Sequence, residues 1–355
     1  MNNSPFKLLC YFLAAIFLVQ ACKHSGSDVQ LPETAQREVP SIQIDFRRAD
    51  LDLRKAYLLH NQNPKLSYIE IYNQIFLPER YFYVDWLYGG DSLLSDSIMA
   101  QDLVGFALDS HTQQLIDSVL IYYPESYNFS KKIQPAIGRL RQYLPDAIVP
   151  RFRTYVSGYS MPGVQTMDQL HLSEQYIGLG LHYFLGDTFK FYPSDIPKFV
   201  RRKFRPEAML PNIFLNYINF YQKELRMKKS PTLLDEMIHN GIKYYFLDVL
   251  LPDVADSVKI GYTHAQIEWV QKFPKEIYND LIPLLYSKDF FKYEKYVRER
   301  PFTPDASRES PGRLGYYVGW QIVRAYMKKN PKTTLTDLLT FQNYDQLFKN
   351  SGYKP

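Results

Sequence analysis

The stretch SPTLLDEMIHNGIKYYFLDVLL, residues 230–251, decides the fold, because it predicts one long helix around which the rest of the chain is organised. Its apolar residues are numerous enough for a buried helix. Ser230 can cap the free backbone amides, and Pro231 suits the first helical position. The acidic residues Asp235 and Glu236 follow near the positive end of the helix. We therefore expect a buried helix that starts at Ser230.

The same stretch contains the one cluster that is close to a catalytic motif. Asp235-Glu236-Met237-Ile238-His239 differs by one residue from the His-Glu-x-x-His pattern of zinc proteases. In that pattern the two His side chains bind zinc, and the Glu polarises the attacking water. Here Asp235 and His239 would take the two ligand positions on one helical face, and Glu236 would be the base. A third ligand is also needed, and the acidic and His residues downstream form no recognisable motif: Asp253, Asp256, His264 and Glu268.

Ordinary helix chemistry explains the same residues. Asp235 completes a capping box with Thr232, and acidic residues are common in any first helical turn. A lone His239 in mid-helix is more often a hydrogen-bonded or exposed side chain than a metal ligand. We therefore treat Asp235, Glu236 and His239 as vestigial and expect no catalytic residue and no bound metal. The alternative is a zinc-dependent peptidase that uses Glu236 as its base, with Asp235 and His239 as metal ligands.

No other cofactor is expected, since the chain has neither a phosphate-binding loop nor a Gly-x-Ser-x-Gly nucleophile turn. The formal charge of +5 over 355 residues is spread thinly, without a dense Lys/Arg block, which argues against nucleic-acid binding. The short basic run from Arg201 to Lys203 is interpreted as a solvated helix face.

The first residues predict export and lipid attachment. Lys7 precedes an apolar run, residues 8–19, that is too short to span a bilayer and fits the core of a signal peptide. The run ends in LVQAC, which looks like a bacterial lipobox and implies cleavage before Cys22 and acylation of that residue, for example with palmitate. We expect residues 1–21 to be the signal peptide and residues 22–40 an acylated tether. The mature protein would then face the periplasm, and Lys23 favours the outer over the inner membrane.

Residues 41–355 are expected to form a single domain of the α+β class that is mostly helical. Alternating patterns around Phe152, and over residues 176–183, predict a small, mostly antiparallel sheet packed on helices. The intervening segments have the spacing of amphipathic helices, with a split near Asp109. Ser310-Pro311 is expected to start a late helix whose glycines at 312, 315 and 319 share one face, which indicates a close contact.

The chain resembles the gliding-motility lipoprotein GldB family of Bacteroidetes. The resemblance rests on the lipobox at Cys22, on LLDEMIHNGIKYY from Leu233, and on shorter pieces: Gly261-Tyr262-Thr263, Pro301-Phe302-Thr303, Ser310 to Gly315 and the terminal SGYKP. GldB-like proteins are also similar to zincin metalloproteases whose ligands have eroded, and Asp235 in place of the first His matches that erosion. The resemblance implies a zincin-like fold and a role in gliding motility and type IX secretion. It does not identify a reaction.

We expect a lipid-anchored, non-catalytic envelope protein, a pseudoenzyme that contacts other proteins of the gliding and secretion machinery. A third hypothesis is a peptide-binding module, in which the strand from Ile177 to Tyr183 accepts a peptide ligand as an additional strand.

Overall fold

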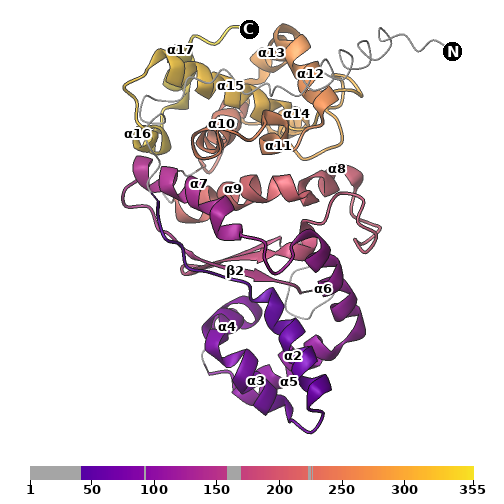
Figure 1. Ribbon diagram of the computed structural model, residues 1–355. Helices are drawn as coiled ribbons and strands as arrows, with labels where there is room; N and C mark the ends of the chain where they lie inside the picture. Colours follow the sequence, from indigo (N-terminus) through magenta and orange to yellow (C-terminus); the bar gives the residue numbers. More distant parts are fainter. Residues whose placement is uncertain (1–40, 92, 158–168, 223–224, 226) are drawn as a thin grey trace, which may run out of the picture.

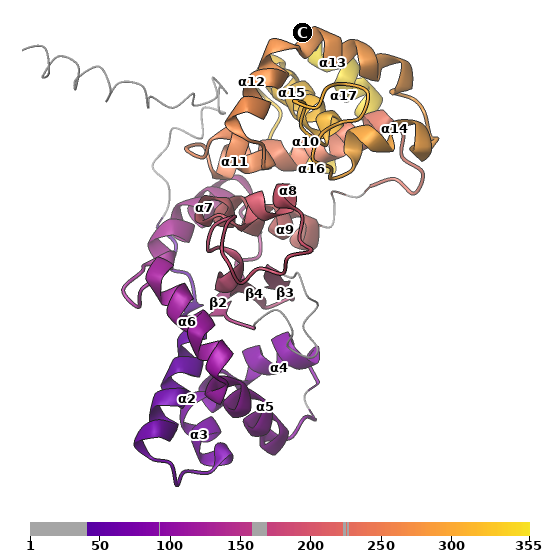
Figure 2. The ribbon, with the colours of Figure 1, turned by 90° about the vertical axis from the view of Figure 1, so that its right-hand side faces the viewer.

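The computed structural model describes residues 41–91, 93–157, 169–222, 225 and 227–355. The predicted signal peptide, the tether and Cys22 lie outside these residues. The described chain is elongated and layered (Figures 1 and 2), with N-terminal helices at one end, a small sheet next to them, and C-terminal helices at the other end. A layer of further helices separates the sheet from the C-terminal helices (Figure 1).

Five helices and one 3-10 turn form the N-terminal layer. They are α2 (Asp50–Gln62), α3 (Tyr68–Ile75), η2 (Leu77–Glu79), α4 (Arg80–Tyr88), α5 (Asp96–Leu108) and α6 (Ser110–Tyr122). The predicted split near Asp109 is confirmed, because the Asp109 side chain accepts a hydrogen bond from the Thr112 amide at 2.8 Å and caps α6. Helix α3 ends at Ile75, and Pro78 lies in the following turn η2, because a proline has no backbone amide to continue an α-helix.

The sheet is mixed, so the expectation of a mostly antiparallel sheet is wrong. Its strands run in the order β1 (Phe46–Arg47), β2 (Arg151–Tyr155), β4 (Tyr176–Gly180) and β3 (Leu170–Leu172). The β1–β2 and β2–β4 pairs are parallel, and β3–β4 is antiparallel. Parallel strands need a long crossover, and the N-terminal helices together with α7 (Phe129–Tyr143) provide it between β1 and β2.

The strand proposed to accept a peptide has no free edge. β4 lies between β2 and β3, and all five of its residues are buried. From Leu181 the chain leaves the sheet as the turn η3 (Leu181–Tyr183). The ring of Tyr155 covers both Gly178 and Gly180, where an added Cβ would lie 3.1 and 3.2 Å from it. Addition of a strand at β4 is therefore ruled out, because its backbone donors and acceptors already pair within the sheet.

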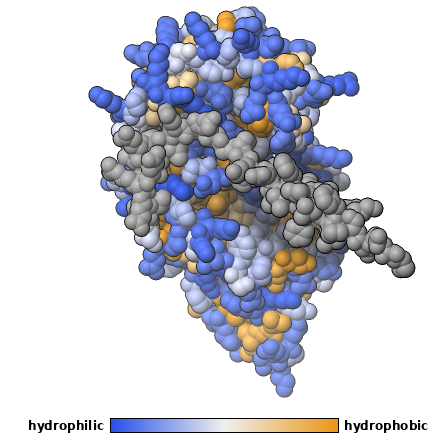
Figure 3. Space-filling view, turned by 45° about the horizontal axis from the view of Figure 1, so that its top comes forward, coloured by the Kyte–Doolittle hydropathy of each residue, from blue (hydrophilic) through white to orange (hydrophobic). Residues whose placement is uncertain are grey.

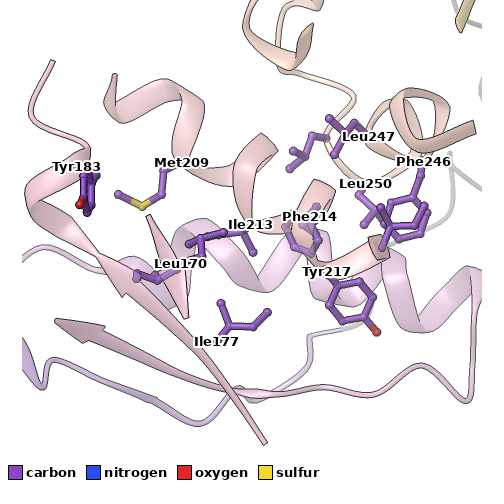
Figure 4. Packing of buried hydrophobic residues seen from close by; sticks show 14 of the residues in the cluster. Leu170, Ile177, Tyr183, Met209, Ile213, Phe214, Tyr217, Phe246, Leu247 and Leu250 are labelled. Atoms are coloured by element: carbon purple, nitrogen blue, oxygen red, sulfur yellow. The ribbon is translucent and has the colours of Figure 1, made fainter. Parts of the chain in front are cut away.

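A helical layer joins the sheet to the C-terminal helices. It contains α7, α8 (Lys198–Arg201) and α9 (Met209–Tyr221), with the turns η4 (Arg202–Phe204) and η5 (Pro206–Ala208) next to α8. Figure 4 shows α9 with apolar side chains directed to both sides. The sheet contributes Leu170 and Ile177, α9 contributes Ile213, Phe214 and Tyr217, and the next helix contributes Phe246, Leu247 and Leu250. These residues belong to one hydrophobic cluster that extends through the layers.

The organising helix is α10 (Leu233–Leu250), and 15 of its 18 residues are buried. Its cap is Thr232, two residues after the expected Ser230. The Thr232 side chain accepts the Asp235 amide hydrogen bond at 3.2 Å, and the Leu234 amide bonds the carbonyl of Leu285 at 2.9 Å. The helix starts at Leu233 because these partners satisfy its first free amides.

The remaining C-terminal elements surround α10. They are α11 (Asp256–Ile260), α12 (His264–Lys272), α13 (Pro274–Leu281), η6 (Ile282–Leu284), α14 (Phe290–Val297), α15 (Leu314–Lys329), α16 (Leu335–Thr340) and α17 (Tyr344–Ser351). The start expected at Ser310-Pro311 is wrong, because Ser310 is bound in a loop to Thr303 and Ser307, and α15 starts at Leu314. Gly312 therefore precedes the helix, while the close contact expected at Gly319 is present against Met237 of α10.

Candidate functional site

Asp235 is held in place by the start of α10. Its Oδ2 accepts hydrogen bonds from the amide and hydroxyl of Thr232, each at 2.9 Å, and its Oδ1 pairs with Lys228 Nζ at 2.6 Å. Burial would raise the pKa of the Asp235 carboxyl, but the hydrogen bonds from Lys228 and Thr232 outweigh burial and hold the pKa below its usual 3.8. Both carboxylate oxygens are thus engaged in capping and in an ion pair.

His239 lies one turn later on α10 and is also buried. Its Nδ1 is 3.4 Å from the hydroxyl of Tyr344, which α17 contributes, and the side chain is about one-twentieth exposed (6%). Burial, assisted by the nearby positive charge of Lys243, lowers the pKa of His239 to about 3. Asp235 acts electrostatically on the same Tyr344. The predicted common face of Asp235 and His239 is therefore real, and Tyr344 covers it.

Glu236 lies on a different, half-buried side of α10. Asn240 donates from Nδ2 to its backbone carbonyl at 2.9 Å, and Lys243 follows on the same side. Burial raises the pKa of Glu236, the charge of Lys243 opposes that shift, and Asp235 adds to it. Burial likewise lowers the pKa of Lys243 to about 8, against the attraction of Glu236. These side chains form a polar, partly desolvated stripe rather than a complete catalytic constellation.

The residues present do not fit the zinc that a zincin-like fold implies. In the part of the chain that the structure describes, no three His, Cys, Asp or Glu side chains are grouped so that they could hold a metal ion. Of the downstream ligand candidates, His264 and Glu268 pair with each other at the surface at 3.5 Å, and Asp256 pairs with Arg324 at 2.7 Å. Asp235 would have to give up its partners Thr232 and Lys228 to bind a cation.

Sequence reasoning missed a buried ionic cluster at the other end of α10. Asp248 is 1% exposed and accepts hydrogen bonds from Lys259 Nζ at 2.9 Å, Trp320 Nε1 at 2.8 Å and Arg324 Nε at 2.7 Å. The Arg324 guanidinium also lies 3.9 Å from the centroid of the Trp320 ring. The sequence contained one signal of this cluster, because Asp248 is an acidic residue inside the apolar run from Phe246 to Leu251. The full set of partners makes this cluster a structural element that ties α10 to α11 and α15.

Comparison with known protein families gives a match over most of the chain. The family model described as gliding motility protein GldB matches residues 32–355. The chain belongs to the GldB family. The match includes every described element, from β1 through α17. No curated protein and no solved structure gives a significant match.

Membership of the GldB family confirms the family predicted from the sequence, whereas the relation to zincins stays a prediction. The matched region contains Asp235, Glu236 and His239 together with the helices that surround them. Among the residues that the structure describes, no helix is both long enough and apolar enough to cross a membrane.

Proposed function

We propose that this GldB-family chain is a lipid-anchored protein of the cell envelope that acts in gliding motility and the linked type IX secretion machinery. Two observations support the proposal: the family match over residues 32–355, and the lipobox-like sequence that ends at Cys22. In this proposal the acyl chains on Cys22 hold the protein to the membrane, residues 22–40 serve as the tether, and the folded body faces the periplasm. The face shown in Figure 3 is mostly hydrophilic, with hydrophobic residues in scattered spots, which suits a body in water.

The protein acts, in this proposal, by binding partner proteins of the machinery and not by catalysis. The observation that carries this part is the engagement of Asp235, whose two oxygens bond Thr232 and Lys228. A carboxylate that caps a helix and pairs with an ammonium is already satisfied, so binding a cation would cost those bonds. Tyr344 also covers His239, the second would-be ligand.

The zinc-dependent peptidase is the second candidate: the residues present do not fit its metal, but one observation favours Glu236 as a general base. Glu236 is half-buried and has a raised pKa, which are properties of carboxylates that work as general bases. Lys243 on the same side, with its pKa lowered to about 8, would provide a second titratable group.

The two candidates are separated by Glu236→Gln, which keeps the shape of the side chain and removes its basicity. In a gliding host deleted for its own copy, we expect the Glu236→Gln chain to restore motility as well as wild type does. Cys22→Ser should fail to restore it, because the anchor is lost. A peptidase would require loss of function in Glu236→Gln, and stoichiometric zinc in the purified protein that disappears in His239→Ala would contradict the non-catalytic role.

A further inference from the structure

A recess next to the start of α15 is lined by positively charged side chains. Arg202 of η4, Arg300 after α14 and Arg313 before α15 line it, together with Gln266 and Glu299. Arg300 and Arg313 belong to the same loop between α14 and α15, whereas Arg202 is far from both in the sequence. The recess is open to solvent, and its interior has room for about one water-sized atom, such as a single phosphate oxygen.

Positive charge exceeds negative charge at this recess. Glu299 is the one carboxylate among the lining residues, and two cations share its Oε2: Lys203 Nζ at 2.6 Å and Arg313 Nε at 3.3 Å. Arg300 pairs with Glu294 at 3.2 Å. Arg202 donates to the neutral amide oxygen of Gln266 at 3.0 Å and has no ion pair within 4.0 Å among the described residues. Three arginines and one carboxylate therefore line the recess, and Lys203 and Glu294 pair with these groups without lining it.

Burial raises the free-energy cost of a positive charge that has no partner. Arg313 is 9% exposed, and its guanidinium already donates to the Tyr244 hydroxyl at 3.1 Å and the Ile260 carbonyl at 2.6 Å, so it contributes mainly its charge. The Nε of Arg300 is buried and has no hydrogen-bond partner in the described part of the chain. Burial also lowers the pKa of Lys203, and the neighbouring charge of Arg313 lowers it further.

We propose that this recess binds one phosphate group, held by the guanidinium groups of Arg202 and Arg300 and attracted by the charge of Arg313. Guanidinium forks donate paired hydrogen bonds to phosphate oxygens. The recess also lies at the positive end of α15, whose N-cap residue Arg313 provides no capping side-chain acceptor.

This site changes the interpretation of the basic run from Arg201 to Lys203. The Arg201 guanidinium bonds the backbone carbonyls of Ile196 and Pro193, each at 2.9 Å, and so fixes the preceding loop. Arg202 and Lys203 are directed instead to the recess and to its carboxylate Glu299. The run is thus divided among a structural arginine, an arginine that lines the recess and a lysine that pairs with Glu299.

Calorimetric titration of the purified full chain tests the site with two probes. The probes are inorganic phosphate and dihexanoyl phosphatidic acid below its micelle-forming concentration. We expect saturable binding and a rise in the thermal unfolding midpoint of wild type. Tighter binding of the phosphatidic acid would identify a lipid headgroup as the source of the phosphate, and equal or weaker binding would identify free phosphate. This proposed phosphate site is independent of the role in gliding motility and secretion proposed above.

Substitutions decide whether the binding is at this recess. Arg202→Met and Arg300→Met should each weaken binding by about tenfold or more, since each removes a charged donor. Arg298→Met is the matched control: Arg298 is 56% exposed, pairs with the same Glu294 at 3.0 Å, and does not line the recess. Arg202→Lys keeps the positive charge and serves as a second variant if Arg202→Met fails to fold. It should bind phosphate more weakly than wild type. Absence of saturable binding by wild type, or equal losses in Arg298→Met and the two Met variants, would overturn the proposal.

Discussion

Gly319 of α15 lies directly on the backbone of Met237 in α10, so closely that an added Cβ would be 1.8 Å from the Met237 carbonyl oxygen. No side chain fits there. On the facing helix, Gly241 is equally restricted, because its Cβ would be 2.4 Å from the carbonyl group of Gly319. The two glycines therefore let the backbones of α10 and α15 lie in direct contact.

Gly319→Ala should therefore be strongly destabilising. The new methyl group meets backbone atoms that cannot move as a flexible side chain would, so we expect a loss of about 3 kcal/mol or more in the free energy of unfolding. Urea unfolding followed by circular dichroism measures it. Gly105→Ala in α5 is the control, because no atom lies within 4 Å of its added Cβ, and the helix should gain up to about 1 kcal/mol. Equal stabilities of the two variants would contradict the contact at Gly319.

Breaking the buried cluster around Asp248 should be costly. Asp248→Leu would leave Lys259, whose side chain is 0% exposed, without its carboxylate, and would remove one partner of Arg324. We expect a loss of about 3–5 kcal/mol, measured by denaturant unfolding. Lys349→Met provides the contrast, since the Lys349–Asp345 pair is at the surface and its removal should change stability by less than about 1 kcal/mol.

The capping role of Asp235 predicts a pH-dependent loss of stability in Asp235→Asn. The folded pKa of Asp235 is below its unfolded value of 3.8, so its contribution is present above that value and is lost as pH falls through the folded pKa. At pH 7 the variant should be less stable than wild type by about 1 kcal/mol or more. Unfolding measured from pH 6 down to pH 3 should show the difference shrinking, and a constant difference would contradict the role of the charge.

His239 predicts a separate pH dependence. Its pKa of about 3 in the folded chain lies below the usual 6.5, so the folded state favours the neutral imidazole. The unfolded chain takes up a proton below about pH 6.5, and stability should therefore fall by up to about 1.4 kcal/mol per pH unit between pH 6.5 and pH 3. His239→Gln should flatten that decline when urea midpoints are compared across the range. An unchanged slope in the variant would show that His239 is solvated.

Local chemistry made several elements predictable. The Asp109 cap and the break at Pro78 depend on residues within one turn, so the chain sequence contains all that determines them. The Thr232–Asp235 capping box was also visible in the sequence, although Ser230 competed with Thr232 as the expected cap. The spacing of Asp235 and His239 placed them correctly on one face of α10, since helical periodicity is local.

Contacts between distant residues were not predictable in the same way. Alternating patterns in a strand do not identify its neighbour, so the parallel pairing of β1 with β2 appeared only in the folded chain. The start of α15 was misplaced because Ser310 found partners in its own loop, Thr303 and Ser307. The basic run at Arg202 was read as a solvated face because its neighbours Arg300 and Arg313 are about one hundred residues away in the sequence.

The amino-acid sequence alone indicated the family, through its resemblance in motifs along the chain. It also predicted helices and the lipobox-like start, because these depend on patterns within short stretches of residues. The tertiary structure decided which polar groups meet. It gave Asp235 a cap and an ammonium partner, covered His239 with Tyr344, and gathered three arginines at one recess. The physical reason is that desolvation and charge pairing depend on distances through space, which only the packing of α10 against its neighbours establishes.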